Sequence, residues 1–472
     1  MVLETWLFKV KKTISHSFDS IHVTTPPPSK KSTCVTKRSK VGVLAFEIAG
    51  IMPKLTHMWR FLSDENMDHL RNHSICLEGV RKLVSNKDAF LLGLACAEMV
   101  ENLRIVALSV SRLSKRCEDL SLAGFETTLD AFANTGHDPC GWALNLKDME
   151  IKIKKMERYV ATTAALYREM DELTIIENNI KKSLNSKKDH HHHDQEVINT
   201  CKQQKILDLQ QKLIWQKQQI KYVKEKSLWN RSFDSITSLL ATSIFTILSR
   251  IKIVFGITQN YPASLPRSLS ASATVYPSDQ TSNSWHVSLI KSTKHQENKE
   301  ISLGFFEINS KILKPLSNTL GAAALALHYA NLIIVMEKMI RSPQLVGLDA
   351  RDDLYSMLPN SIRSSLRGRL KGIGFTATDP VLAGEWREAL NKILGWLSPL
   401  AHNMIKWQSE RSFEHQNRVP KTNVLLLKTL YFANQEKTEA AIAELLVGLN
   451  YIWRFEREMN AKALFNCSSP VK

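Results

Sequence analysis

Apolar residues recur every three to four positions through most of this chain, which is the period of an α-helix that buries one face. The pattern predicts helices over 43–61, from Ser85 towards Cys117, over 229–256 and from Ile442 to Met459. Glycine and proline are scarce, at 17 and 15 of 472 residues, which disfavours a turn-rich β fold. We therefore predict an all-α protein built from multi-helix bundle domains.

Two stretches between 143 and 230 carry residues in alternating steps of four and three, the heptad spacing of a helical seam. The seam residues are Met149, Ile153, Met156, Val160 and Thr163 in the first stretch, and Ile206, Leu209, Leu213, Gln216, Ile220 and Val223 in the second. They predict a long, coiled-coil-like helical hairpin. Its arms can pair with each other or with another chain, so self-association through 149–223 stays open.

Composition changes divide the chain. Residues 23–40 combine three prolines with hydroxyl and basic residues, and 257–300 are rich in Ser, Thr, Pro and Asn without apolar periodicity. Both read as linkers, the second as disordered. The expected organisation is a basic N-terminal segment and linker (1–40), an N-terminal helical domain (41–142), the hairpin with an apolar helix (143–256), a disordered linker (257–300) and a C-terminal helical domain (301–472).

The C-terminal domain begins with a long apolar stretch rich in small residues. We expect one helix from near Ser317 or Thr319 to near Arg341, followed by a short helix with Asp349 as N-cap and Asp352 three positions on. Further along, a short Leu-rich helix is expected over 423–432. Pro399 interrupts an apolar pattern from Trp386 to Trp407, which predicts a kink or a break there.

A third helix, after Pro359, is expected to present basic residues beside its apolar face. Arg363, Arg367 and Lys371 follow at steps of four, with Arg369 close by. This stripe suits a phosphate group or an acidic peptide. It can equally pair with Asp349, Asp352 and Asp353 just upstream.

Several long runs of this sequence match a known plant family. They are VGVLAFEIAGIMPKLTHMWRFLSDENMDHLR, EGVRKLVSN, TLGAAALALHYANLI, LDARDDLYSMLP and SIRSSLRGRLK. The runs resemble the domains of unknown function in the PSK simulator family, whose members are linked to phytosulfokine signalling and growth. The resemblance implies a non-enzymatic regulator or scaffold that works inside the cell through protein partners, and it brings no catalytic motif with it.

Positive charge gathers near the N-terminus. The net charge is +17, and residues 1–40 hold eight Lys and Arg against two acidic residues. The residues Lys30, Lys31, Lys37, Arg38 and Lys40 are candidates for nuclear import or for binding anionic lipid. The alternative function is therefore a peripheral membrane adaptor. Nucleic acid is a partner that a basic chain permits, but it is not favoured here.

No phosphate-binding loop, GxSxG, HExxH or paired CxxC motif occurs in the sequence. We therefore predict no enzyme, no catalytic or metal site and no cofactor. His328 and Asn331, one turn apart, are read as a satisfied core pair, and His137 with Cys140 and the four histidines at 190–193 as having no metal role. Seven scattered cysteines indicate reduced thiols in an intracellular compartment.

The expected location is the nucleus, the cytoplasm or both, with the plasma-membrane surface as the alternative. The N-terminal apolar run is too short for a secretion signal. Two uncharged stretches, 315–336 and 235–249, are read as buried helices rather than membrane spans. Some family members begin with a Met-Gly myristoylation signal, whereas this chain begins Met1-Val2, so N-myristoylation is not expected.

Overall fold

The computed structural model describes residues 39–185, 196–257, 304–342, 347–371, 377–411 and 424–467. Those residues form helices and no strand, with two isolated β-bridges, Lys40 with Ser232 and Thr319 with Asn434. The all-α prediction is therefore confirmed. The candidate residues Lys30, Lys31, Lys37 and Arg38, the histidines at 190–193 and nearly all of the predicted linker 257–300 lie outside the described residues.

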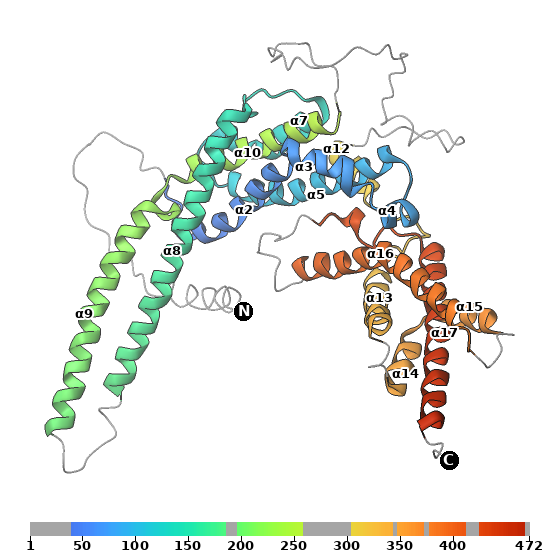
Figure 1. Ribbon diagram of the computed structural model, residues 1–472. Helices are drawn as coiled ribbons and strands as arrows, with labels where there is room; N and C mark the ends of the chain where they lie inside the picture. The colour runs from blue at the N-terminus through green and yellow to red at the C-terminus, as the bar shows by residue number, and fades with distance from the viewer. Residues whose placement is uncertain are drawn as a thin grey trace, which may run out of the picture.

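An N-terminal bundle surrounds the first hydrophobic core (Figure 1). Ser63 caps one of its helices, because its hydroxyl accepts a hydrogen bond from the Asn66 N–H. The long central helix, Asp88–Ser114, packs against several neighbours and buries Leu91, Leu94 and Val100. The bundle consists of η1 (Gly42–Leu44), α2 (Ala45–Phe61), α3 (Asp64–His69), the π-helical turn η2 (Leu70–Ser74), α4 (Glu78–Leu83), α5 (Asp88–Ser114), α6 (Leu120–Ala123), α7 (Phe125–Thr135), α10 (Phe233–Val254) and α12 (Phe305–Ile312).

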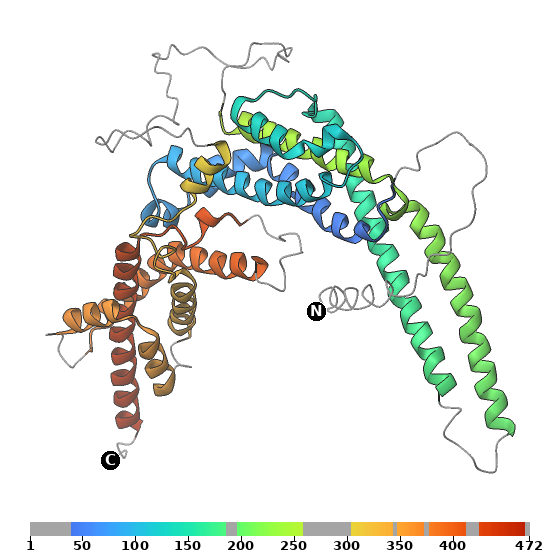
Figure 2. The same ribbon diagram turned by 180° about the vertical axis from the view of Figure 1, so that it is seen from behind.

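The predicted hairpin is formed by α8 (Leu146–Asn185) and α9 (Glu196–Lys226), which lie side by side and extend away from the N-terminal bundle (Figures 1 and 2). A short turn, η3 (Leu228–Asn230), connects α9 to α10. In α9 the seam positions Ile206, Gln216 and Ile220 are buried. The two arms therefore pack against each other within the chain. The seam residues predicted for the first arm, Met149, Ile153 and Met156, are instead buried in the core of the N-terminal bundle.

A C-terminal bundle encloses the second hydrophobic core. Its helices are α13 (Ala326–Arg341), α14 (Leu348–Met357), α15 (Asn360–Leu370), α16 (Pro380–Arg411) and α17 (Gln435–Cys467), with the turn η6 (Leu426–Lys428). The apolar pattern around Leu390, Leu397 and Met404 is buried as expected. The break considered at Pro399 does not occur, since α16 continues through this residue.

Three expected local details are wrong. The helix expected from Ser317 or Thr319 begins only at Ala326, because residues 319–321 pair with the segment before α17: the N–H groups of Leu320 and Gly321 donate to the carbonyls of Ala433 and Tyr431, each at 2.9 Å. The helix α14 begins at Leu348 with Gly347 as its N-cap, so Asp349 lies in the first turn. The segment 424–432 forms the 3-10 turn η6 and further turns in place of the expected helix, and its leucines are buried in the two cores.

Among the described residues, α10 alone has the length and composition of a membrane-crossing helix. Within its most apolar window, 67% of the residues are buried inside the protein. It packs against α5, α2, α6, α7 and α8, so its apolar surface is covered by other helices of the N-terminal bundle. The stretch 315–336, also considered as a membrane span, is not one continuous helix, because its residues before Ala326 are not helical.

Candidate functional site: an arginine-rimmed pocket

A pocket of about 270 Å³ lies where α14, α15 and α17 meet in the C-terminal bundle. An elbow at Leu358 and Pro359, both extended, turns the chain from α14 into α15, which packs against α17. The Arg351 side chain of α14 reaches Trp453 of α17. The pocket exists because the side chains that line it do not fill the space enclosed by this elbow. Its lining residues are Arg351, Asp352, Leu354, Tyr355, Leu358, Leu366, Leu370, Leu446, Asn450, Trp453, Arg454 and Arg457.

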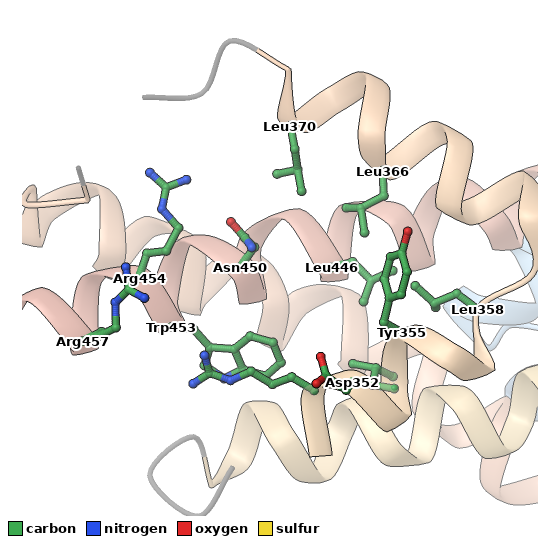
Figure 3. A pocket seen from close by; sticks show the side chains of 12 residues that line it. Asp352, Tyr355, Leu358, Leu366, Leu370, Leu446, Asn450, Trp453, Arg454 and Arg457 are labelled. Carbon is green, nitrogen blue, oxygen red and sulfur yellow. The ribbon is translucent and has the colours of Figure 1, made fainter. Parts of the chain in front are cut away.

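The pocket has an apolar end and a cationic end (Figure 3). Leu358, Leu366 and Tyr355 lie towards one end, and Arg454 and Arg457 lie at the other (Figure 3). The α17 residues of the lining fall at positions 446, 450, 453, 454 and 457, the spacing of one helical face. Three arginines against the single carboxylate of Asp352 give the lining a formal positive charge.

Two hydrogen-bond donors in this pocket are buried without an acceptor. They are Nε of Arg351 and Nε1 of Trp453. The Arg351 guanidinium stacks over the Trp453 ring, 4.4 Å from its centroid, which orients both groups. Buried donors usually have partners, so two unsatisfied N–H groups beside further arginines are a site that an anionic or carbonyl oxygen would complete.

The structure places the predicted basic stripe beside this pocket, with most of its charge already engaged. Arg363 donates to the Ser356 carbonyl at 2.6 Å and lies over the Tyr355 ring, and Arg367 donates to the Tyr355 hydroxyl at 3.0 Å. Arg369 forms an ion pair with Glu444, while Lys371 is exposed. None of the four lines the pocket, and no ion pair with the upstream aspartates is found among the described residues. These arginines tie α14 and α17 to α15.

The pocket residues Arg351, Asn450, Trp453, Arg454 and Arg457 were missed by the sequence analysis. The period of the last helix reports its apolar stripe, whereas the polar residues that face the pocket lie beside that stripe. The signal that would have found them is two arginines and a tryptophan within five positions of one helix. Their partner Arg351 lies about a hundred residues earlier, and nothing local links it to Trp453.

The structure also gives the positions of the other residues named from the sequence. His328 is half-buried with Nε2 2.9 Å from the Met357 carbonyl, whereas Asn331 is exposed, so they do not form the expected core pair. Lys40 donates to the Asn230 side chain at 2.5 Å. His137 and Cys140 are exposed. No group of three or more potential metal-ligating side chains occurs within the described part of the chain.

A buried carboxylate joins the two bundles away from the pocket. Glu98 on α5 accepts hydrogen bonds from the Leu426 N–H at 2.6 Å, the Arg411 guanidinium at 3.3 Å and the Trp407 indole at 3.4 Å. Burial raises the pKa of the Glu98 carboxyl above its usual range, and these three donors oppose the shift. Because its donors come from α16 and the segment around η6, Glu98 fixes how the C-terminal bundle sits on α5.

Comparisons with known proteins agree with the resemblance in the sequence. Residues 43–99 match a domain of unknown function, DUF3475, and residues 319–406 match a protein family of unknown function, DUF668. The second match includes α14 and α15, two of the three helices around the pocket. These descriptions give no sign of an enzymatic activity. No solved structure matches the chain.

Three curated proteins of Arabidopsis thaliana are similar over most of this chain. Protein PSK SIMULATOR 1 is 26% identical over 93% of the chain and 60% of its own length. Protein PSK SIMULATOR 3 is 24% identical over 89% of the chain and 57% of its own length. Protein PSK SIMULATOR 2 is 24% identical over 90% of the chain and 61% of its own length. The chain thus spans about six tenths of the relatives' length. The resemblance to the PSK simulator family is therefore confirmed over most of the chain.

Proposed function

We propose that this chain is a non-enzymatic regulator or scaffold in phytosulfokine-type growth signalling, and that it holds a protein partner through the arginine-rimmed pocket. The names of its relatives support the signalling role. The observation that carries the binding role is the pair of buried, unsatisfied donors, Arg351 Nε and Trp453 Nε1, in a pocket with a positive rim.

The chemistry of the pocket defines the partner segment. A carboxylate or phosphate of the partner would accept from the two donors and lie near Arg454 and Arg457. An apolar side chain next to it would fill the leucine-lined end. A pocket of about 270 Å³ accommodates a few side chains rather than a large cofactor. We therefore expect a short segment with an acidic or phosphorylated residue beside a bulky apolar one.

Quantitative affinity purification from plant cells tests this function. The wild-type chain is compared with Arg457→Glu, which reverses an exposed charge at the pocket, and with Trp453→Phe, which removes the indole donor and keeps a ring. Lys371→Glu is the matched control, since it reverses an exposed charge outside the pocket lining. We expect one set of proteins to be depleted by both pocket variants and retained by the control. Identical recovery from all four chains would refute a role for the pocket.

The alternative function, a peripheral membrane adaptor, depends on the basic residues between Lys30 and Lys40. Such a segment is attracted to anionic lipid by about 1 kcal/mol per charge near the surface, and import receptors read the same kind of cluster. We propose the nucleus or cytoplasm as the main location. Imaging of the full chain beside a version truncated before Val41, with lipid flotation of both, distinguishes these outcomes. Exclusive plasma-membrane signal that is lost on truncation would favour the adaptor.

A further inference from the structure

A second, smaller pocket of about 180 Å³, here called the junction pocket, lies where the two bundles meet. One wall comes from the end of α2 and from α3 and η2 of the N-terminal bundle, and the other comes from the segment around η6, between α16 and α17. Pockets for drug-sized ligands generally measure about 300 Å³ or more, so this one fits a small ion. Part of the lining is apolar, and its polar residues are Asn66, His69, Ser74 and Lys428.

Lys428 brings a positive charge to the junction pocket without a partner for it. The residue is half-buried, and none of the described residues that line the pocket is acidic. Its backbone is engaged, since its N–H donates to the Leu425 carbonyl at 3.0 Å and its carbonyl accepts from the Asn403 side chain at 3.1 Å. Burial lowers the pKa of the Lys428 ammonium below its usual range, and no neighbouring carboxylate opposes the shift. An ammonium removed from water in this way is stabilised by an anion.

A π-helical turn brings His69 and Ser74 together at this pocket. Positions five apart on an α-helix point about 140° away from each other. The turn η2 is wound more widely, as the bond from the Ile75 N–H to the Leu70 carbonyl shows. The Ser74 hydroxyl oxygen therefore lies 3.4 Å from Nδ1 of His69. Such turns are rare in helices and occur frequently at functional sites.

Ser74 sets the hydrogen-bonding character of the His69 ring. Ser74 is only 5% exposed, so its hydroxyl depends on a partner inside the protein. When this hydroxyl donates to Nδ1, the neutral ring carries its proton on Nε2. The Nε2 atom forms no hydrogen bond with any described residue. His69 thus offers a second donor to a ligand, and Ser74 is the residue that positions it.

Asn66 adds an acceptor to these two donors. Its amide nitrogen donates to the Arg60 carbonyl at 2.9 Å and to the Ser63 hydroxyl at 3.0 Å. These bonds use the nitrogen end of the amide, and no described residue donates to the oxygen end. A ligand that fits this pocket therefore accepts hydrogen bonds and also donates one. Inorganic phosphate does both at neutral pH, because it keeps a proton, whereas sulfate has none and a phosphate monoester has lost its own above about pH 6.

We propose that the junction pocket binds inorganic phosphate and that the bound ion ties η2 to η6 across the two bundles. Lys428 and His69 donate to the unprotonated oxygens, with the charge-assisted bond from Lys428 the stronger. The P–OH group donates to Asn66 Oδ1. The site is separate from the arginine-rimmed pocket and reinforces the junction, since Leu426 of the same turn already donates to Glu98 of α5 at 2.6 Å.

Isothermal titration calorimetry of the full-length chain with sodium phosphate, at neutral pH and constant ionic strength, tests the proposal. Lys428→Met keeps an unbranched side chain and removes the charge, so it should weaken phosphate binding more than about tenfold. His69→Ala, at an exposed position, should weaken it as well. Lys371→Met is the matched control, because Lys371 is an exposed lysine outside this pocket. Far-UV circular dichroism establishes that the variants keep their helices.

Arg457→Glu separates this site from the arginine-rimmed pocket. It reverses a charge in that other pocket, so phosphate binding that depends on Lys428 should persist in this variant. No binding to the wild type overturns the proposal, as does binding that Lys428→Met leaves unchanged or that Arg457→Glu abolishes. Loss of binding in Lys428→Met alone leaves the proposed partner site untouched, so the two ideas fail separately.

Sulfate and methyl phosphate test the need for a protonated oxygen. Both are expected to bind more weakly than inorganic phosphate at neutral pH, because neither then donates to Asn66. Sulfate bound as tightly as phosphate overturns the role of Asn66. Methyl phosphate bound at least as tightly overturns the assignment to the free ion and gives the pocket to the end group of a phosphorylated molecule.

Discussion

At the scale of single residues, close backbone contacts explain why two positions of this chain are glycine. A Cβ atom at Gly321 would lie 2.5 Å from the Tyr431 carbonyl oxygen, the same oxygen that accepts the Gly321 N–H. A Cβ at Gly79 would lie 2.3 Å from the Trp396 carbonyl oxygen where α4 meets α16. Each glycine therefore permits two backbone segments to approach more closely than any side chain allows.

Replacement of Gly321 by Ala should destabilise the protein. The added methyl group has to displace backbone rather than a movable side chain, so we expect a loss of about 1–3 kcal/mol, measured as a fall in the thermal midpoint. The control is Gly395→Ala within α16, where a Cβ meets nothing within 4 Å. There, alanine should stabilise by about 0.5–1 kcal/mol through its helix propensity. Equal effects at the two sites would contradict the packing argument.

At the scale of elements, the sequence predicts a helix well where one continuous apolar stripe meets one core. The helix over 43–61, the hairpin and the pattern around Leu397 all lie close to their expected positions. The errors fall where non-local pairing decides the backbone. Thr319–Gly321 pairs with Tyr431–Asn434, more than a hundred residues away, and helix propensity cannot report such a contact. The pocket was missed for the same reason, since Arg351 and Trp453 come from different helices.

The elbow between α14 and α15 should depend on Arg363. This half-buried side chain hydrogen-bonds the Ser356 carbonyl near the end of α14 and lies 5.2 Å from the centre of the Tyr355 ring. Arg363→Ala should cost about 1–2 kcal/mol of unfolding free energy, because a charged donor and a cation–π contact are lost together. Lys371→Ala, at an exposed position, should change stability little. Chemical denaturation measures both, and an Arg363→Ala variant as stable as the wild type would show that these two contacts do not hold the elbow.

At the scale of the whole molecule, two bundles with separate cores meet along α4, α5, α16 and the segment around η6. This junction contains the buried Glu98 carboxylate, only 6% exposed. The relative placement of the hairpin and the pocket depends on the junction, because α5 belongs to the bundle that carries the hairpin, whereas Arg411 and Leu426 adjoin the bundle that forms the pocket. The protonation state of Glu98 is therefore linked to the architecture as a whole.

Stability should fall with rising pH through the titration of Glu98. Burial raises the pKa of this carboxyl in the folded protein above 4.5, its value in an exposed setting. Between the two pKa values the folded state binds more protons than the unfolded state, so the unfolding free energy decreases as the pH rises through that window. Below pH 4.5 both states are protonated, and the protein avoids the cost of a buried charge.

Glu98→Gln removes this titration and keeps the shape of the side chain. The amide has one acceptor oxygen fewer for Arg411 and Trp407, which shifts the unfolding free energy of the variant by the same amount at every pH. The informative quantity is therefore the slope of the unfolding free energy with pH. From pH 4.5 to neutral pH, the wild type should lose stability relative to Glu98→Gln, since the folded wild type has to release a proton from a buried carboxyl and the amide does not. A wild type that instead gains stability relative to Glu98→Gln as the pH rises would mean that Arg411 outweighs burial and holds Glu98 ionised.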